Sequence, residues 1–319
     1  MRAAIIGLGV IGKVHYSVLK ASGEDIVALC DIDVEKLGEY EGVKKYLNYK
    51  MMLDNEKIDV VHICTPHYLH AEMVIYALNK GINVLCEKPL CISFEEIESV
   101  LEAEKNSAAQ LGVCFQNRYN ATSIFAKNYL ADKKIKYAYG VVRWHRDKAY
   151  YDSAEWRGKK ATEGGGVLIN QAIHTLDLLE WIIGDVKEVC GETFRTKLKD
   201  VIEVEDTVVA DFRAKSDFSL IATTTAEQDM PIELRFFTEN EVLSFTPEVV
   251  KINGKEADID KDFGWLGKLS YGNGHEKLIR DFYACVRDDT RFGIDGEEGA
   301  KALRAVLGVY RSHGEIVKI

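Results

Sequence analysis

The stretch that most constrains the fold lies at the start of the chain, where an apolar segment runs directly into a glycine-rich turn. Residues 3–7 form a predicted buried strand, and residues 7–12 read Gly-Leu-Gly-Val-Ile-Gly before a predicted helix over 13–22. In such a GxGxxG turn the glycines permit a tight bend, close approach of a pyrophosphate and close helix–strand packing. The N–H groups at the helix start suit phosphates. The turn therefore predicts a dinucleotide site formed by Gly7, Gly9, Val10, Ile11 and Gly12.

An acidic residue follows the glycines at the spacing that a dinucleotide site requires. A second strand, predicted over 25–30, ends at Asp31, 19 residues after Gly12. A carboxylate about 20 residues beyond the glycines accepts a hydrogen bond from a ribose 2′-hydroxyl. The same carboxylate would repel a 2′-phosphate, so Asp31 favours NAD, and NADP is the less favoured cofactor. A glycine-rich turn without a ligand is the alternative, and it fits this context poorly.

Beyond Asp31 the chain continues to alternate between predicted strands and helices. Strands over 59–64, 82–85 and 110–115 are separated by helices over 70–80 and 93–107. This alternation predicts a parallel sheet with right-handed crossovers. Ligands bind at the carboxyl edge of such a sheet. The loops at that edge should line one cleft. Their candidate cofactor contacts are Thr65, Pro66, His70, Glu87, Lys88 and Gln116, and Arg118 is a candidate substrate contact. His70 can also be a polar contact or a helix-start residue.

Lys88 is the candidate for proton chemistry within these loops. It stands in Glu87-Lys88-Pro89, where the proline ends the preceding strand. A lysine fixed at the ligand edge can carry a proton if its surroundings lower its pKa from ~10.4 towards ~7–8. A surface lysine in a turn is the alternative, and the motif alone does not separate the two.

Length and composition bound the remaining possibilities. The 319 residues suggest two domains of about 150 residues each. The net charge of −10 argues against a nucleic acid or an anionic membrane surface as partner. The seven scattered cysteines have no zinc-site spacing, so we expect reduced thiols, a cytoplasmic location and no metal. The chain enters a strand without a signal peptide and has no apolar run long enough to span a membrane.

The pattern changes past residue 120. A helix is predicted over 122–132 and an alternating strand over 136–146. An aromatic and basic loop follows, which could stack on a sugar ring and bind a carboxylate or phosphate. A surface loop with a structural Trp-Arg pair is an equally good alternative. The candidate substrate contacts in this loop are Arg146, Tyr151, Trp156 and Arg157.

A helix predicted over 167–183 is apolar nearly all round and should therefore be buried. Asn170, His174 and Asp177 break the apolar surface at i, i+4 and i+7, on one face. Buried polar groups need partners. Either His174 is a core histidine bonded to Asp177, or these residues form a site with Lys88 across a cleft.

The rest of the chain predicts a second sheet. Strands over 186–197, 206–213, 218–226, 232–238 and 241–245 follow one another through short turns, which indicates a largely antiparallel, open sheet. The helix over 167–183 or a second subunit can cover its face. A loop over 261–273 and helices over 275–288 and 296–312 complete the chain.

Taken together, these motifs resemble the Gfo/Idh/MocA family of NAD(P)-dependent oxidoreductases. The matching stretches are 7–12, Cys-Thr-Pro-His-Tyr-Leu-His at 64–70, Cys-Glu-Lys-Pro-Leu at 86–90, Gln-Asn-Arg-Tyr-Asn at 116–120, and Gly-Gly-Gly at 164–166 through His-Thr-Leu-Asp at 174–177. With the patterns above, we expect an α/β Rossmann domain over 1–118, a parallel sheet with helices on both faces. An α+β domain with a large, open, mostly antiparallel sheet should follow over 119–319 for substrate binding and oligomerisation, its C-terminal helices able to pack back on the first domain.

The resemblance also implies roles for single residues. Lys88 would be the catalytic proton carrier, before a cis proline, and Glu87 would lie beside the nicotinamide ribose. Thr65 and Pro66 would border the nicotinamide. His174 matches the family's catalytic histidine, close to the reacting hydroxyl, and which of Lys88 and His174 is the principal base stays open.

Asn170 stands where inositol dehydrogenase-like members carry aspartate. We therefore count Asn170 as a catalytic and a substrate-binding candidate, and Asp177 as a substrate-binding candidate. This difference, the Trp-Arg-Gly stretch at 156–158 and the Gly-Gly-Gly-x-Leu-x-Asn-Gln stretch at 164–171 resemble the branch acting on nucleotide-linked N-acetylglucosaminuronic acid. Lys159 and Lys160 depart from the Thr-Trp often found there.

The resemblance implies hydride transfer between the nicotinamide and a secondary hydroxyl carbon of a sugar, cyclitol or nucleotide sugar. It also implies a homodimer or homotetramer. A different class stays open, a sensor or co-regulator of the same fold that binds the dinucleotide without turnover. The presence of both Lys88 and His174 argues against that class.

Overall fold

The computed structural model describes residues 1–259 and 274–319, so the predicted loop over 261–273 lies outside the described residues. The described chain divides into two compact units. We call residues 1–116 with 274–300 the N-terminal unit, and residues 117–259 with 301–319 the C-terminal unit. The predicted division into functional domains at residue 118 stays a prediction.

The N-terminal unit is built on a six-stranded sheet with the order β3-β2-β1-β4-β5-β6. All of its strand pairs are parallel, which confirms the predicted architecture. The chain winds outward from β1 in one direction and from β4 in the other, so the edge between β1 and β4 is the topological switch point. The strands are β1 Arg2–Ile6, β2 Asp25–Cys30, β3 Lys44–Tyr46, β4 Val60–Ile63, β5 Asn83–Glu87 and β6 Leu111–Cys114.

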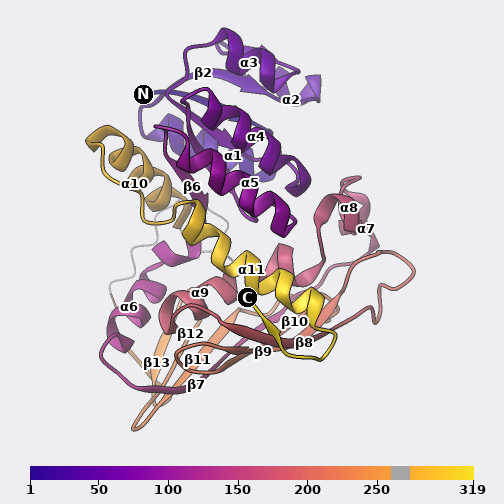
Figure 1. The fold of residues 1–319 in the computed structure, drawn as a ribbon, viewed down its shortest axis with the longest axis vertical. Coiled ribbons are helices and arrows are strands. Elements are labelled where there is room, and N and C mark those ends of the chain that lie inside the picture. Colours follow the sequence, from indigo (N-terminus) through magenta and orange to yellow (C-terminus); the bar gives the residue numbers. More distant parts are fainter. Residues whose placement is uncertain (260–273) are drawn as a thin grey trace. The chain divides into compact units, whose positions relative to one another are not determined.

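Helices cover both faces of this sheet (Figure 1). Ser93 caps α5 as predicted, because its side chain accepts a hydrogen bond from the Glu96 N–H. The helix α10, far along the chain, packs on the same unit, where a Cβ on Gly112 would lie 2.7 Å from the Phe282 ring. The helices of this unit are α1 Val10–Ala21, α2 Val34–Gly38, α3 Tyr49–Asn55, α4 His70–Asn79, α5 Phe94–Lys105 and α10 Gly274–Asp288.

The C-terminal unit is built on a nine-stranded sheet with the order β14-β13-β12-β11-β7-β10-β9-β8-β15. Only the β7–β10 pair among these strands is parallel, so the mostly antiparallel sheet is confirmed. The sequence pattern missed three strands of two or three residues, which are too short to show alternation. The strands are β7 Ile135–Arg143, β8 Glu188–Phe194, β9 Thr207–Arg213, β10 Phe218–Thr223, β11 Glu233–Thr238, β12 Val242–Phe245, β13 Val250–Ile252, β14 Lys255–Glu256 and β15 Val317–Lys318.

One face of the large sheet is covered by α9, Ile173–Ile183 (Figure 1). The contact is close at β7, where a Cβ on Gly140 would lie 2.6 Å from Thr175 Cγ2. The other helices of this unit are α6 Ala121–Leu130, α7 Lys148–Asp152 and α8 Lys160–Glu163, while α11, Gly296–Ser312, begins in the N-terminal unit. None of the described helices is long and apolar enough to cross a bilayer.

Two sequence expectations need correction in this unit. The predicted continuous helix over 167–183 is a π-helical turn, Leu168–Ala172, followed by α9. The predicted loop after β7 contains the short helices α7 and α8. Local sequence periodicity does not report a single wide turn, and such turns are frequent at functional sites.

Candidate active site

In the glycine turn after β1, two glycines are needed for close packing and one leaves the backbone accessible. Gly7 has a φ of +91°, and a Cβ there would lie 2.6 Å from the Cys64 carbonyl oxygen. A Cβ on Gly12 would lie 2.0 Å from the Gly7 carbonyl oxygen. Gly9, by contrast, has no heavy atom within 4 Å of its Cβ position. Gly7 and Gly12 are therefore required by the fold, and Gly9 leaves the backbone open to a ligand.

The helix α1 presents its first N–H groups at this turn. Its N-cap residue is Gly9, which makes no side-chain cap, and its first turn contains no acidic residue. Val10 is exposed and Ile11 is half-buried. The partial positive charge of an uncapped helix start is suited to a pyrophosphate.

Asp31 lies at the end of β2 with both carboxylate oxygens engaged. Oδ2 accepts a hydrogen bond from the Leu8 N–H at 2.7 Å, and Oδ1 accepts one from the Asp33 N–H at 2.9 Å. Lys36 Nζ lies 3.7 Å from Asp31 and 3.7 Å from Asp33. Two carboxylates facing one ammonium leave a net negative charge, which disfavours a 2′-phosphate here.

Two exposed apolar side chains beside Asp31 were missed by the sequence reasoning. Ile32 is 89% exposed and Val34 is 64% exposed. Exposed aliphatic side chains next to a ribose-binding carboxylate offer an apolar surface to an adenine ring. The sequence feature that could have identified them is a pair of large apolar residues in the turn directly after the predicted strand.

The strand-end loops of β4 and β5 are joined by His70. Its Nδ1 lies 2.7 Å from the Pro89 carbonyl oxygen, and its Nε2 lies 2.8 Å from the Thr65 carbonyl oxygen. Burial lowers the pKa of this ring, while the two backbone contacts oppose that effect. The Lys88–Pro89 peptide bond is cis, as the resemblance implied. His70 therefore holds the Thr65-Pro66 loop against the loop that contains Lys88.

Gln116, at the end of the N-terminal unit, carries a polar atom that suits a ligand. The residue is 3% exposed, and within the described part of the chain its Oε1 has no hydrogen-bond partner. A buried acceptor without a partner is costly, and a bound group can supply the missing donor. Together with the open Gly9 turn and Asp31, this orphaned oxygen fits a dinucleotide.

Glu87 is the end of a buried polar chain that sequence reasoning did not foresee. Its Oε1 lies 3.1 Å from His15 Nε2 and 3.6 Å from His275 Nε2. His15 Nδ1 lies 2.8 Å from His62 Nδ1, and His62 Nε2 lies 2.9 Å from the Tyr283 hydroxyl. The only signals were a histidine three residues after the glycine turn and another inside an apolar strand.

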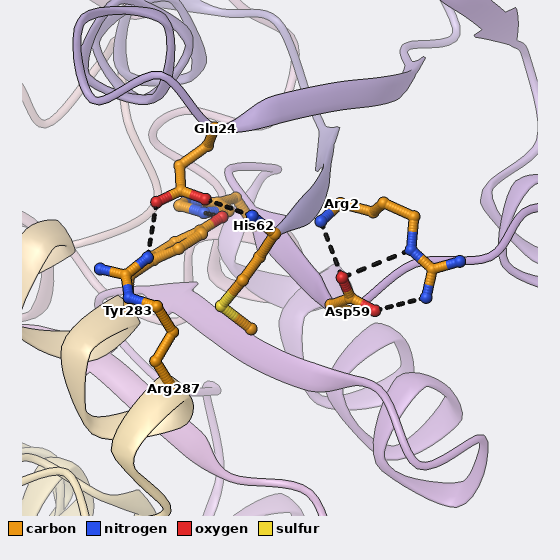
Figure 2. A network of polar contacts seen from close by, with 7 residues as sticks. Arg2, Glu24, Asp59, His62, Tyr283 and Arg287 are labelled. Atoms are coloured by element: carbon orange, nitrogen blue, oxygen red, sulfur yellow. Dashed lines mark hydrogen bonds and ion pairs between the residues drawn. The ribbon is translucent and has the colours of Figure 1, made fainter.

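Figure 2 shows the outer end of this chain, where the Tyr283 side chain points from α10 to His62. Nearby, Glu24 accepts from the Met1 ammonium at 2.6 Å and from Arg287 at 2.8 Å. The potential metal-ligand atoms of His15, Glu87 and His275, ring nitrogens and a carboxylate oxygen, lie within 4.8 Å of one another. His15 and Glu87 are joined directly by the hydrogen bond of 3.1 Å.

In the C-terminal unit, Arg118 and Asp177 form a bidentate pair. Arg118 Nε lies 2.9 Å from Oδ2 of Asp177, and one terminal nitrogen lies 2.6 Å from Oδ1. Both side chains are buried, and the guanidinium also lies 5.5 Å from the Trp181 ring centre. Asp177 therefore has Arg118 as a partner, and the choice between the two predicted roles of His174 stays open. His174, 3% exposed, lies one turn before Asp177 on α9.

Asn170 lies in the π-helical turn. Its side chain is oriented by Glu163, which the sequence analysis did not single out. Its Nδ2 donates to Oε1 of Glu163, which is 1% exposed. Oε2 of Glu163 accepts from the Gly158 N–H at 2.5 Å. Burial raises the pKa of Glu163 to about 7, although these hydrogen bonds act against the rise.

The aromatic and basic residues after β7 gather around Tyr150. The guanidinium of Arg157 lies 4.4 Å from the Tyr150 ring centre and 4.7 Å from that of Trp156. Arg146 lies 5.0 Å from the same Tyr150 ring and forms an ion pair with Asp229 at 3.0 Å. Tyr151 instead packs in an apolar cluster with Leu198, Ile202 and Val204. Stacking therefore fixes both arginines, and Tyr151 belongs to a local core.

The fold and these residues define a class, that of oxidoreductases with a Rossmann-type dinucleotide-binding domain and a second, sheet-based domain. Residues 1–115 match the Gfo/Idh/MocA family described as "Oxidoreductase family, NAD-binding Rossmann fold". Residues 133–244 match the Gfo/Idh/MocA C-terminal domain. The chain belongs to the Gfo/Idh/MocA oxidoreductase family, and its cofactor is NAD. The resemblance found in the sequence is thus confirmed.

Two relatives of this chain are inositol dehydrogenases. The inositol 2-dehydrogenase of Salmonella typhimurium is 28% identical over 193 residues, 58% of this chain and 55% of that protein. The match therefore spans about half the length of that relative. The myo-inositol 2-dehydrogenase of Thermotoga maritima is 24% identical over 320 residues, 95% of this chain and 93% of that protein.

The fold is also that of a solved dehydrogenase. The WlbA dehydrogenase from Bordetella pertussis, crystallised in complex with NADH and UDP-GlcNAcA, superposes with a TM-score of 0.90 at 28% identity. The match covers 100% of this chain and 97% of that one.

Proposed function

We propose that this protein is an NAD-dependent dehydrogenase that transfers hydride between the nicotinamide and a secondary hydroxyl carbon of a sugar, with a nucleotide-linked uronic acid as the favoured substrate. The observation that carries the proposal is the position of Lys88. It follows the buried Glu87 at the carboxyl end of β5, in an NAD-binding domain whose Gly9 turn is open to a ligand.

The N-terminal unit binds the cofactor. The N–H groups at Gly9, Val10 and Ile11 receive the pyrophosphate, and Asp31 accepts a hydrogen bond from the adenosine ribose. Thr65 and Pro66, held by His70, border the nicotinamide, and Gln116 contributes its orphaned oxygen. When bound, NAD supplies the hydride acceptor, and the protein has to orient it and move one proton.

Lys88 and His174 handle that proton. A substrate hydroxyl must lose its proton as its carbon loses hydride, and a positioned base accelerates this step. Lysine and histidine are both side chains that enzymes tune for the task. In this proposal Lys88 is the base that takes the proton, and His174 is the alternative base.

The C-terminal unit recognises the substrate. The Arg118–Asp177 pair and the Glu163–Asn170 hydrogen bond fix polar groups at the start of α9 and in the π-helical turn. The stacked Arg146 and Arg157 suit the carboxylate and phosphates of a nucleotide-linked uronic acid, for which guanidinium is the preferred partner. The complex of the related WlbA dehydrogenase with UDP-GlcNAcA supports this substrate class.

The proposal also includes assembly and location. The face of the large sheet opposite α9 exposes Tyr137, Val209 and Ile221, which suits a homodimer or homotetramer. All seven cysteines are free thiols, as suits a reducing cytoplasm.

The test is NADH absorbance on mixing the protein with NAD⁺ or NADP⁺ and a panel of free and UDP-linked sugars and uronic acids. We expect a signal with NAD⁺ and a UDP-linked uronic acid. A signal with free inositol alone would contradict the substrate class. NAD⁺ binding without turnover on any sugar would replace the enzyme by the non-catalytic sensor.

A further inference from the structure

A buried chain of hydrogen bonds runs from Tyr283 to Glu87. Its donor-to-acceptor direction sets the charge on Glu87. Each link is short: 2.9 Å from Tyr283 to His62, 2.8 Å from His62 to His15, and 3.1 Å from His15 to Glu87. Tyr283 is 1% exposed, the two histidines are fully buried and Glu87 is 6% exposed. All four side chains lie in the N-terminal unit, on α10, β4, α1 and β5.

The direction follows from counting hydrogens. A neutral imidazole carries one N–H, so one of the two facing Nδ1 atoms must donate and the other accept. Burial lowers the pKa of both His15 and His62, which keeps the rings neutral. Among the described residues, the Tyr283 hydroxyl has His62 Nε2 as its hydrogen-bond partner. A buried phenol hydrogen needs an acceptor, so Tyr283 donates to His62 Nε2.

The remaining links are then fixed in turn. His62 Nε2 accepts, so its hydrogen lies on Nδ1 and is donated to His15 Nδ1. His15 Nδ1 accepts, so its hydrogen lies on Nε2 and is donated to Oε1 of Glu87. Glu87 is left as a pure acceptor, which is the ionised carboxylate. The reversed chain would require a protonated Glu87 and would leave the buried Tyr283 hydrogen without its acceptor.

Other polar groups also face the Glu87 carboxylate. The Lys88 N–H lies 3.3 Å from Oε2 and His275 Nε2 lies 3.6 Å from Oε1. Burial raises the pKa of the nearby Cys64, Cys86 and Cys114 thiols, which stay neutral. Burial also disfavours the charge on Glu87, but the hydrogen bond from His15 and the proximity of the His275 ring outweigh it and hold the pKa of Glu87 well below the usual range.

We propose that Tyr283, His62 and His15 are positioning residues that fix Glu87 as a buried carboxylate, and that this carboxylate favours the oxidised, positively charged nicotinamide over the neutral reduced one. The second part rests on the proposed function and on the position beside the nicotinamide ribose that the family resemblance implies for Glu87. In a buried site a carboxylate attracts a ring cation more strongly than in water. NAD⁺ gains from that attraction and NADH does not.

The hydrogen-bond direction can be tested without the cofactor, by nitrogen NMR of the full chain labelled with ¹⁵N-histidine. We expect the Nε2–H tautomer for His15 and the less common Nδ1–H tautomer for His62, both neutral at about pH 7. Tyr283→Phe keeps the ring and removes the donor, so His62 should lose its single tautomer. The opposite tautomer pair in the wild type, or an unchanged His62 signal in Tyr283→Phe, would overturn the proposal.

The effect on the cofactor is tested by the dissociation constants of NAD⁺ and NADH, measured separately. His15→Leu should raise the NAD⁺ constant relative to the NADH constant by about tenfold. His15→Gln, which retains an amide N–H, should restore most of the wild-type ratio, and Tyr283→Phe should lie between the two. Tyr76→Phe, which removes a surface hydroxyl bonded to Asp54 at 2.8 Å, is the matched control and should change neither constant.

Equal weakening of both cofactor forms in His15→Leu would show a merely structural role and overturn the carboxylate effect. Failure of the wild type to bind either dinucleotide would count against the proposed function itself. The tautomers of His15 and His62 would then still decide the hydrogen-bond chain.

Discussion

At the scale of single residues, chemistry in this protein depends on groups whose charge is fixed by buried neighbours. Glu87 is held by His15, and Asp177 is held by Arg118. Lys88 and His174 are the residues proposed for the proton transfer. Their individual contributions are measurable by single substitutions.

Lys88→Ala should lower turnover by about 10²–10⁴-fold and leave NAD binding nearly intact, because it removes the proposed general base and leaves the glycine turn and Asp31 in place. The readout is steady-state NADH formation together with a dissociation constant for NAD⁺. Lys105→Ala, at an exposed position at the end of α5, is the control. Undiminished turnover in Lys88→Ala would remove Lys88 from the mechanism.

Asp177→Ala should destabilise the protein by about 3–5 kcal/mol, because it leaves the buried Arg118 charge without its partner. The double variant Arg118→Met with Asp177→Leu should recover most of that loss. Urea unfolding measures both. Asp152→Ala, which breaks an exposed pair with Lys148, should cost at most about 1 kcal/mol, and a loss in Asp177→Ala no larger than that would refute the argument.

At the scale of elements, α9 is the piece that links the sheet to the site. It packs on β7 at Gly140, and its polar face holds His174 and Asp177. The π-helical turn before it brings Asn170 to Glu163. The position of α9 on the sheet therefore sets the geometry of the proposed substrate-binding residues.

Gly140→Ala should cost about 1–3 kcal/mol, because its Cβ would lie 2.6 Å from Thr175 Cγ2 and 3.0 Å from a Leu179 methyl in a packed core. Adding Thr175→Ser removes the nearest atom and should return part of the stability. Thermal unfolding gives both values. Gly38→Ala is the control. No heavy atom lies within 4 Å of its added Cβ, so this substitution should be close to neutral. If Gly140→Ala were as mild as Gly38→Ala, α9 would not be fixed at β7.

Glu180 of α9 makes stability depend on pH. Burial raises its pKa to about 7, with the Val186 N–H acting in the opposite direction. A pKa that is raised in the folded state means that the folded protein binds more protons than the unfolded chain between about pH 4.5 and 7. The free energy of unfolding should therefore fall as pH rises through this window, by up to about 3 kcal/mol from this group.

Glu180→Gln, which resembles the protonated acid, should remove that contribution, while Glu155→Gln at an exposed position should not. Urea unfolding at about pH 5 and about pH 8 compares them. A wild-type profile with the same slope as Glu180→Gln would contradict the assignment.

At the scale of the whole molecule, the large sheet presents an apolar face that the described chain leaves exposed. Val209 and Ile221 are each 45% exposed and lie opposite each other on β9 and β10. Ile221→Asp should therefore shift a dimer or tetramer to monomers, as measured by analytical ultracentrifugation. Leu47→Asp, at another exposed apolar position in the N-terminal unit, should leave the assembly unchanged. A monomeric wild type would end this part of the proposal.

The sequence by itself determined the parallel sheet of the N-terminal unit, the glycine turn, Asp31 and the cap at Ser93. The strands, the glycine turn and the cap depend on residues a few positions apart, the range over which backbone geometry and turn chemistry act. The parallel sheet and Asp31 follow from the regular order and spacing of these local elements along the chain. The mostly antiparallel sheet was also predictable, since its longer strands alternate in polarity. The short strands β13 to β15 and the π-helical turn were not, because they are too brief to show a period.

Only the tertiary structure decided which buried polar groups meet. His62 and Tyr283 are 221 positions apart, and Arg118 and Asp177 are 59 apart. A buried polar atom must find a partner, but nothing local says which distant segment will bring one. For the same reason Tyr151 was assigned to the substrate loop by its neighbours in sequence, whereas its neighbours in space place it in an apolar cluster.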